Sequence, residues 1–198
     1  MKPYQVRPDG TLERRAVAAA LLADPGDMLV VTGLGAPGFD AFVPGDRPEN
    51  FYLWGAMGGA AMVGLGLALA QPTRRVLVLT GDGEMLMGVG SLATIAAIAP
   101  SNLSIAVLDN ARFGETGSQR SHTGLTTDLA AVARACGWAE TMTVTDMDGV
   151  AALADAVRQR PVFAVARIAP GELVRVLPPR DGAFLAQRMR AALGFPPA

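Results

Sequence analysis

Apolar runs of strand length recur along the chain, and helical stretches lie between them. The strand-like runs show no polar alternation and are centred on residues 28–32, 76–79, 103–108 and 162–168. Runs that are apolar on both faces and alternate with helices are typical of a parallel sheet covered on both sides. We therefore predict an α/β fold with a doubly wound parallel sheet.

Helical patterns occupy most of the remaining chain. They predict helices within residues 12–23, 61–70, 88–99, 128–137 and 148–159. A Pro/Gly-rich passage then leads to an amphipathic stretch from about residue 182, in which Arg188 and Arg190 are typical of a solvated face. A length of 198 residues suits one domain, 1–198, that ends in this helical tail.

The uncharged segment from Trp54 to Ala70 imitates a membrane span. Its length is at the short limit for crossing roughly 30 Å of hydrocarbon. We therefore expect a buried helix, in which small residues such as Gly64 and Gly66 let another backbone approach closely.

Composition and charge narrow the class of partner. Hydrophobic residues make up 51% of the chain and charged residues 18%, as in a globular interior, and the formal net charge is -1 at pH 7. That balance predicts neither a nucleic-acid partner nor an anionic membrane. The lone Cys136 cannot form an internal disulfide, and the opening residues 1–10 contain no apolar run that would predict a signal peptide, so we expect a cytoplasmic protein.

The stretch from Gly33 to Gly38 matches G-x-G-x-x-G after a strand, a pattern found in dinucleotide-binding folds. Such a fold needs a helix at this point and an acidic residue at the end of the next strand. Because Pro37, Pro44 and Pro48 follow, we expect a loop in place of the helix. The pattern therefore does not indicate nicotinamide binding.

Two polar positions follow neighbouring predicted strands. Asp82 lies in a GDG sequence after one strand, and Asn110 ends the next, with one helix and one strand between them. Both side chains should emerge at the same sheet edge and offer hard oxygen ligands suited to Mg²⁺ with phosphate oxygens. The N–H groups of Gly83 and Glu84 at a helix start could hold the phosphate. The alternative is that Asp82 caps a helix and Asn110 makes a turn.

The GDG sequence, its spacing to "DN" and the upstream "WGAMG" together carry a family resemblance. They resemble the diphosphate-binding domain of thiamine-diphosphate enzymes, and within these the sulfopyruvate and phosphonopyruvate decarboxylases. The similarity runs from about Met28 to Val144. It implies thiamine diphosphate and Mg²⁺ as cofactors.

The resemblance also implies roles for individual residues. Asp82 and Asn110 would bind Mg²⁺ through their side chains, and Arg112 through its backbone carbonyl. The Gly55 carbonyl would bind the cofactor's exocyclic amine, and Met57 would lie between its two rings and hold them in a bent shape. The implied cofactor-binding residues are Gly33, Gly55, Met57, Asp82, Gly83, Glu84, Asn110, Arg112, Phe113 and Gly114.

Glu84 departs from the small residue often found after GDG in these enzymes. A carboxylate about 4 Å from a diphosphate charge would cost on the order of 4 kcal/mol at an effective dielectric constant of 20. We therefore expect Glu84 to contribute its backbone N–H and to direct its carboxylate to a partner group or a water molecule.

The glutamate that activates the cofactor's aminopyrimidine ring has no counterpart in this chain. In the family it lies on a separate pyrimidine-binding domain, for which 198 residues leave no room, and Glu13 has the wrong context. The resemblance therefore implies one subunit of a split, hetero-oligomeric enzyme. It would convert 3-sulfopyruvate or a similar small anionic 2-oxoacid into an aldehyde and CO₂.

Two other functions remain open on the sequence alone. The cofactor motif does not determine the outcome of the reaction, so a carboligase or another 2-oxoacid decarboxylase is the first alternative. The second is a flavodoxin-like regulatory module in which the GDG sequence is an ordinary turn.

The polar, glycine-containing loop from Phe113 to Gly124 is typical of a mobile segment over a site. It contains Glu115 and the lone histidine, His122, which are the candidate catalytic residues on this chain. His122 could donate a proton, or could bind a second substrate anion together with Arg120. The alternative is an exposed loop in which His122 merely titrates in water.

Overall fold

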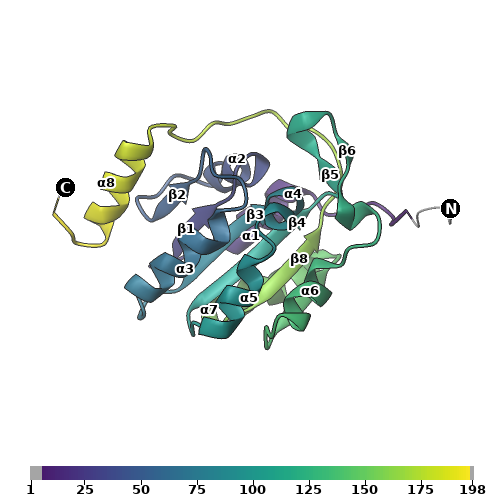
Figure 1. Cartoon of the computed structure of the whole chain (residues 1–198). Coiled ribbons are helices and arrows are strands. Elements are labelled where there is room, and N and C mark those ends of the chain that lie inside the picture. Colours follow the sequence, from purple (N-terminus) through teal and green to yellow (C-terminus); the bar gives the residue numbers. More distant parts are fainter. Residues whose placement is uncertain (1–5, 197–198) are drawn as a thin grey trace.

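The computed structural model describes residues 6–196, so both ends of the domain expected over 1–198 lie outside the described residues. Six parallel strands form one sheet in the order β2-β1-β3-β4-β8-β7 (Figure 1). Their bounds are β1 Leu29–Thr32, β2 Asn50–Tyr52, β3 Val76–Gly81, β4 Leu103–Asp109, β7 Thr141–Val144 and β8 Phe163–Arg167. A short antiparallel pair joins β5 Arg112–Phe113 to β6 Gln119–Arg120.

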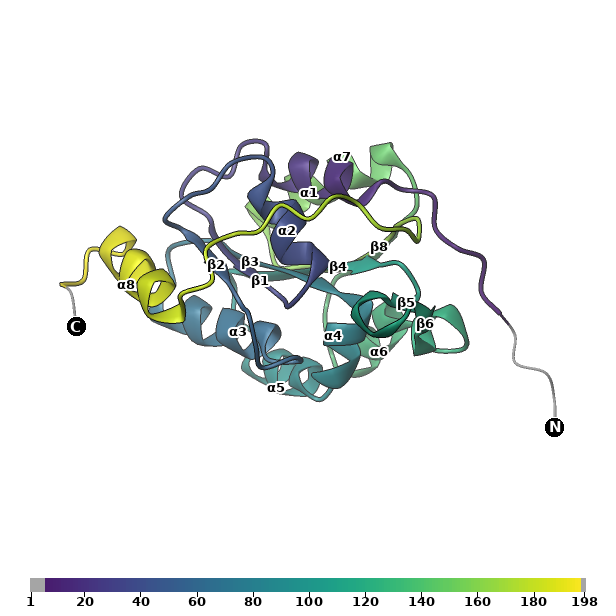
Figure 2. The same cartoon turned by 90° about the horizontal axis from the view of Figure 1, so that it is seen from above.

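Helices cover both faces of the large sheet. Their bounds are α1 Arg14–Leu22, α2 Ala36–Phe42, α3 Ala60–Ala70, α4 Asp82–Met87, α5 Ser91–Ile98, α6 Leu129–Ala135, α7 Met147–Gln159 and α8 Gly182–Ala192. Figure 2 shows α1, α2 and α7 on one side of the sheet and α3, α5 and α6 on the other. The predicted doubly wound α/β fold is confirmed.

Alternate residues of the central strands supply the two halves of the core. In β3, Leu77 and Leu79 pack toward α1 and α7, whereas Val76 and Val78 pack toward α3 and α5. These side chains are at most 1% exposed. A strand buried on both faces needs the unbroken apolar run that this part of the sequence has.

The region after β1 corrects one expectation from the sequence. A helix, α2, begins at Ala36, where the prolines predicted a loop. Pro37 lies in the first turn of α2, where a missing backbone N–H removes no helical hydrogen bond. The acidic residue that a dinucleotide site needs is nevertheless missing, because β2 ends at Tyr52 and is followed by Leu53 and Trp54.

The uncharged helix α3 is buried on one face only. A Cβ on Gly64 would collide with the Val78 side chain of β3, so a side chain approaches this glycine closely in place of the backbone expected there, whereas Gly66 faces open space. Met62, Val63 and Leu69 are 43%, 38% and 55% exposed, so the prediction of a buried helix is wrong for this side. Within the described part of the chain, no helix combines the length and apolar character needed to cross a membrane.

The segment between β8 and α8 crosses the outside of α2 in an extended conformation (Figure 2). The indole N–H of Trp54 donates to the Pro179 carbonyl at 2.7 Å and fixes one end of it. The predicted tail helix, α8, packs on β2, where Arg188 forms an ion pair with Asp46 and lies over the Tyr52 ring. Arg188 is therefore a packing residue, and its assignment to a solvated face is wrong.

Candidate active site

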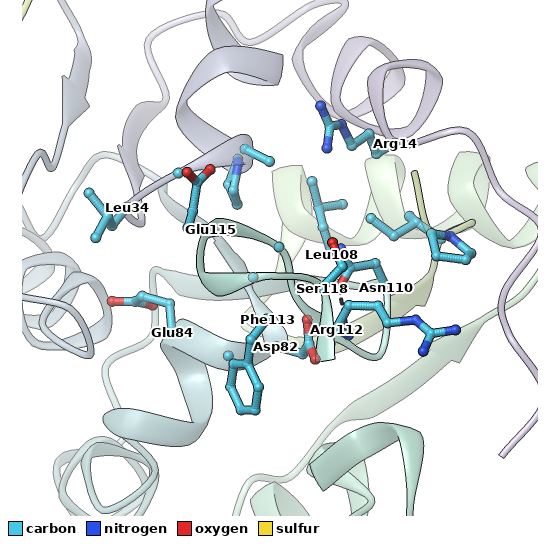
Figure 3. A pocket seen from close by; sticks show the side chains of 18 of the residues that line it. Arg14, Leu34, Asp82, Glu84, Leu108, Asn110, Arg112, Phe113, Glu115 and Ser118 are labelled. Atoms are coloured by element: carbon cyan, nitrogen blue, oxygen red, sulfur yellow. Dashed lines mark hydrogen bonds between the residues drawn. The ribbon is translucent and has the colours of Figure 1, made fainter. Parts of the chain in front are cut away.

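A cavity of about 410 Å³ opens at the carboxyl ends of β1, β3 and β4. Asp82, Asn110 and Glu115 line it (Figure 3). Gly83 and Arg175 are also among its lining residues. In an open parallel sheet, ligands bind in this position beyond the strand ends. The predicted position of Asp82 and Asn110 at one sheet edge is therefore confirmed, because β3 and β4 are hydrogen-bonded neighbours.

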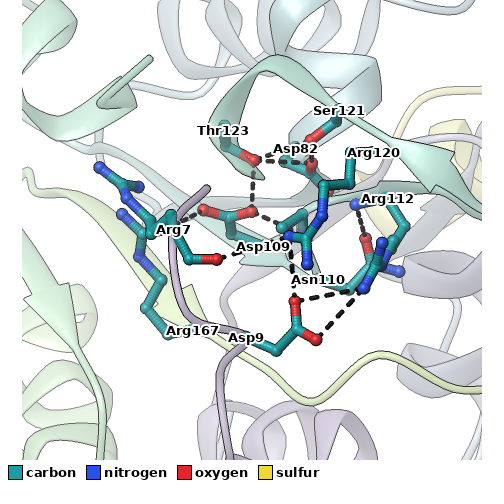
Figure 4. A network of polar contacts seen from close by, with 11 residues as sticks. Arg7, Asp9, Asp82, Asp109, Asn110, Arg112, Arg120, Ser121, Thr123 and Arg167 are labelled. Atoms are coloured by element: carbon teal, nitrogen blue, oxygen red, sulfur yellow. Dashed lines mark hydrogen bonds and ion pairs between the residues drawn. The ribbon is translucent and has the colours of Figure 1, made fainter. Parts of the chain in front are cut away.

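Asp82 is the first residue of α4 and only 2% exposed. The hydroxyl groups of Ser121 and Thr123 both contact its Oδ2 atom, Thr123 at 3.0 Å (Figure 4). The helix begins without a side-chain cap, so the alternative interpretation of Asp82 as a helix cap is wrong. Burial, and then the nearby charge of Asp109, raise the pKa of Asp82 to about 6.

Asp109 joins the same polar network from the last position of β4. Its Oδ1 accepts a hydrogen bond from the Thr123 hydroxyl at 2.7 Å, and its Oδ2 lies 3.0 Å from Nη1 of Arg167 (Figure 4). Burial raises the pKa of Asp109 as well. Thr123 therefore lies between two buried carboxylates and connects them.

Asn110 makes the turn foreseen in the alternative interpretation, because its Oδ1 accepts from the Arg112 N–H at 2.9 Å. An amide oxygen has two lone pairs, so this bond leaves one for another ligand. Ala111, which lies between Asn110 and Arg112, has a φ of 59°, in the left-handed region that is uncommon for alanine. The Arg112 guanidinium pairs with Asp9 at 3.2 Å, so a role in the cavity would fall to its backbone.

Gly83 is needed because the Phe113 ring lies against it. A Cβ at Gly83 would lie 2.9 Å from the ring atom Cδ1, closer than carbon atoms pack. The same hypothetical atom would lie 3.8 Å from Cε of Met57, so the side chains of Met57 and Phe113 both come close to this glycine. Phe113 also packs edge-on against the ring of His122.

The Glu84 carboxylate points away from Asp82, as expected (Figure 3). Its Oε1 accepts from the N–H groups of Gly58 and Ala60 at 2.9 and 3.1 Å, and the Thr80 hydroxyl contacts its Oε2. A Cβ on Gly33 would collide with Thr80 and approach this carboxylate, which explains the small residue after β1. The prediction that Glu84 directs its charge to a partner group is confirmed.

Of the remaining predicted residues, some line the cavity and others do not. Met57, Gly114 and Glu115 line the cavity, and Gly55 lies in the turn between β2 and α3. His122 and Arg120 are not among the described residues that line the cavity. His122 is exposed, as its alternative interpretation expected, and Arg120 pairs with Asp9 at 3.4 Å.

Ser121 and Thr123 were not singled out from the sequence, because two hydroxyl residues two positions apart in a loop give no signal by themselves. Asp109 begins one of the stretches after an apolar run in which a doubly wound sheet places its site residues, but its own role was not predicted. Arg14 and Asp40 also line the cavity and were missed; they form an ion pair at 3.0 Å, and burial raises the pKa of Asp40.

The donor atoms around Asp82 suit a Mg²⁺ ion. Both hydroxyl contacts fall on Oδ2, and among residues 6–196 no side-chain donor reaches Oδ1. A carboxylate and an amide oxygen are hard ligands, and Mg²⁺ takes the rest of its shell from phosphate and water. No three His, Cys, Asp or Glu side chains group together in the described ranges, so a zinc-type ligand set is lacking there.

Comparison with protein families gives a match over residues 34–167 to the thiamine pyrophosphate enzyme, C-terminal TPP binding domain; thiamine pyrophosphate is thiamine diphosphate. The chain belongs to this family. It is 43% identical over 145 residues to the sulfopyruvate decarboxylase subunit beta of Methanothermobacter thermautotrophicus, covering 73% of this chain and 76% of that subunit. Membership argues against the flavodoxin-like alternative.

Longer members of the family are also similar. The chain is 43% identical over 189 residues to phosphonopyruvate decarboxylase of Streptomyces viridochromogenes, covering 93% of this thiamine diphosphate-binding domain but only 47% of that enzyme. The fold resembles benzoylformate decarboxylase of Polynucleobacter necessarius with a TM-score of 0.66 and 19% identity, covering 84% of this chain and 35% of that structure. The chain thus spans about half, or less, of these relatives.

Proposed function

We propose that this chain, as one domain over residues 1–198, is the diphosphate- and Mg²⁺-binding subunit of a split, cytoplasmic 2-oxoacid decarboxylase. The observation that carries the proposal is the cavity edge, where Asp82 and Asn110 emerge from β3 and β4 in a chain that aligns with most of a sulfopyruvate decarboxylase beta subunit. The substrate would be 3-sulfopyruvate or phosphonopyruvate. It would lose CO₂, gain a proton at the carbonyl carbon and leave as an aldehyde.

Different cavity residues would bind different parts of the cofactor. Asp82, Asn110 and the Arg112 carbonyl would hold Mg²⁺, and the N–H groups of Gly83 and Glu84 would hold the diphosphate. The remaining contacts would come from Gly33, Gly55, Met57, Phe113 and Gly114. Thiamine diphosphate, when bound, supplies the electron sink that decarboxylation of a 2-oxoacid requires.

The other half of the active site would come from a separate pyrimidine-binding subunit that carries the catalytic glutamate. The exposed side of α3 supports a partner: Met62, Val63 and Leu69 lie there, and Met87 at the end of α4 is 65% exposed. Apolar groups gathered beside a cavity are typical of an interaction surface. Met57, three residues before α3, is 41% exposed and lines the cavity.

The loop after Asn110 would supply groups close to the substrate. Glu115 lines the cavity and forms an ion pair with Arg175 at 3.2 Å, so its charge is balanced at the cavity mouth. The His122 ring packs against Phe113, which lines the cavity. Its roles as proton donor, or with Arg120 as ligand for a second anion, remain predictions for the assembled enzyme.

The test is reconstitution of activity from two chains. The full chain should release no CO₂ from 3-sulfopyruvate or phosphonopyruvate alone. Addition of the partner, Mg²⁺ and thiamine diphosphate should give CO₂ and an aldehyde, and EDTA should abolish both. Turnover without a partner would refute the split architecture, and formation of a carbon–carbon bond to an added aldehyde would identify the carboligase alternative.

A further inference from the structure

Glu84 connects two turns that are distant in the sequence. It lies on α4 and is 4% exposed, and its Oε1 accepts from the backbone of Gly58 and Ala60 at the start of α3. The first residues of α3 have no side-chain cap of their own. Glu84 therefore accepts from the N–H of Ala60, the first residue of α3, and from that of Gly58 just before the helix, and the helix dipole favours its negative charge there.

The turn that receives these hydrogen bonds has an unusual backbone. Ala56 has a φ of 52° and Gly58 a φ of 92°, and Met57 lies between them. Non-glycine residues in the left-handed region persist where their surroundings fix them. Glu84 binds the N–H immediately after Met57, so it fixes the turn at the residue that faces the cavity.

The two backbones also meet directly. A Cβ on Gly88, at the end of α4, would collide with the carbonyl group of Gly58. This contact and the Glu84 bonds hold both ends of α4 against the turn that carries Met57. Because Gly83 lies on the same helix, the distance from the GDG sequence to Met57 is set by this packing.

We propose that Glu84 is a positioning residue that sets where Met57 lies relative to the GDG turn. The inference rests on the proposed function, in which the GDG turn holds the diphosphate and Met57 the rings. Glu84 then governs recognition of the thiamine part of the cofactor and leaves recognition of the diphosphate part unchanged. Glutamine at this position keeps an acceptor for both N–H groups, and its NH₂ can donate to Thr80.

The direct contact can be tested by hydrogen exchange in the full chain without ligands. Glu84→Ala should speed exchange at Gly58 and Ala60 about tenfold, the loss of roughly one buried hydrogen bond, while β3 and β4 remain protected. Glu84→Gln should keep most of the protection. The control Asp155→Ala, at a side chain 77% exposed on α7, should change neither. Unchanged exchange at Gly58 and Ala60 in Glu84→Ala would overturn the inference.

The functional consequence can be tested by calorimetry of the full chain with two probes, Mg²⁺–thiamine diphosphate and Mg²⁺–inorganic diphosphate. Glu84→Ala should weaken binding of the first at least tenfold and change binding of the second less than twofold, whereas Glu84→Gln should stay within threefold for both. Equal losses for both probes, no loss for either, or much tighter binding by Glu84→Gln would overturn the positioning role. Wild-type chain that binds neither probe, by itself or with its partner subunit, would instead refute the proposed function.

Discussion

Replacement of Asp82 by asparagine should stabilise the chain in the absence of ligands. Its carboxylate is 2% exposed, and burial together with Asp109 raises its pKa from 3.8 to about 6. At 1.36 kcal/mol for each pKa unit, ionised Asp82 costs the folded state on the order of 3 kcal/mol at neutral pH. Asparagine can present its oxygen to Ser121 and Thr123 without this cost.

The pH dependence gives the sign of the effect. A carboxyl group whose folded pKa is raised binds its proton more tightly in the folded state, so the free energy of unfolding falls as the pH rises from about 4 through 6. Asp82→Asn has no carboxyl group at this position, so its free energy of unfolding does not fall in this way. Its advantage over wild type should reach about 1–3 kcal/mol at pH 7.5, a rise in Tm of about 3–10 °C, and should shrink as the pH is lowered to 4.

Thermal unfolding followed by circular dichroism, with and without Mg²⁺ and thiamine diphosphate, checks both halves of this prediction. Ligands at a hundredfold excess over Kd should stabilise wild type by about 2.7 kcal/mol and leave Asp82→Asn unchanged. The control Asp155→Asn removes one exposed charge and should change stability by less than about 0.5 kcal/mol. A lower Tm for Asp82→Asn at pH 7.5, or undiminished ligand stabilisation, would refute the reasoning.

Two further substitutions test the close packing and the exposed apolar surface. Gly83→Ala places a Cβ 2.9 Å from the Phe113 ring, so it should cost about 1–3 kcal/mol of stability and weaken binding of Mg²⁺–thiamine diphosphate. The control Gly90→Ala, whose Cβ would lie in open space, should do neither. Equal affinities of the two variants for Mg²⁺–thiamine diphosphate in calorimetry would contradict this prediction. Met62→Lys on α3 should leave Tm unchanged but weaken assembly with the partner subunit in sedimentation experiments. The control Met147→Lys, at an exposed methionine on α7, should leave both Tm and assembly unchanged. Equal assembly by both variants would place the interface elsewhere.

The central sheet and the position of the site could be predicted because they depend on local patterns. The apolar runs of β3 and β4 are continuous, and the crossover between them brings Asp82 and Asn110 to one edge by chain geometry alone. The strands β2 and β7 were missed because both are short and carry Asn50 or Thr141 in place of an apolar run.

Other features depend on contacts that no local pattern encodes. Ser121 and Thr123 reach Asp82 because the chain after β6 returns to the first residue of α4, and a serine and a threonine two residues apart do not predict that path. The exposure of Met62 could not be predicted either. A run without charges indicates burial, but it does not indicate whether the covering surface belongs to the same chain.

The two carboxylates next to Gly83 show how one turn can hold opposite roles. Glu84 has contacts on both oxygens, with two backbone N–H groups on Oε1 and a hydroxyl on Oε2. Its carboxylate is therefore stabilised by groups of the protein itself. The hydroxyl contacts of Asp82 fall on Oδ2 alone, in a buried position that makes its charge costly. A cation at Oδ1 would relieve that cost, whereas the Glu84 carboxylate already has donors on both of its oxygens. The chemistry of the turn is therefore decided by which oxygen atoms the surrounding hydroxyl and N–H groups leave free.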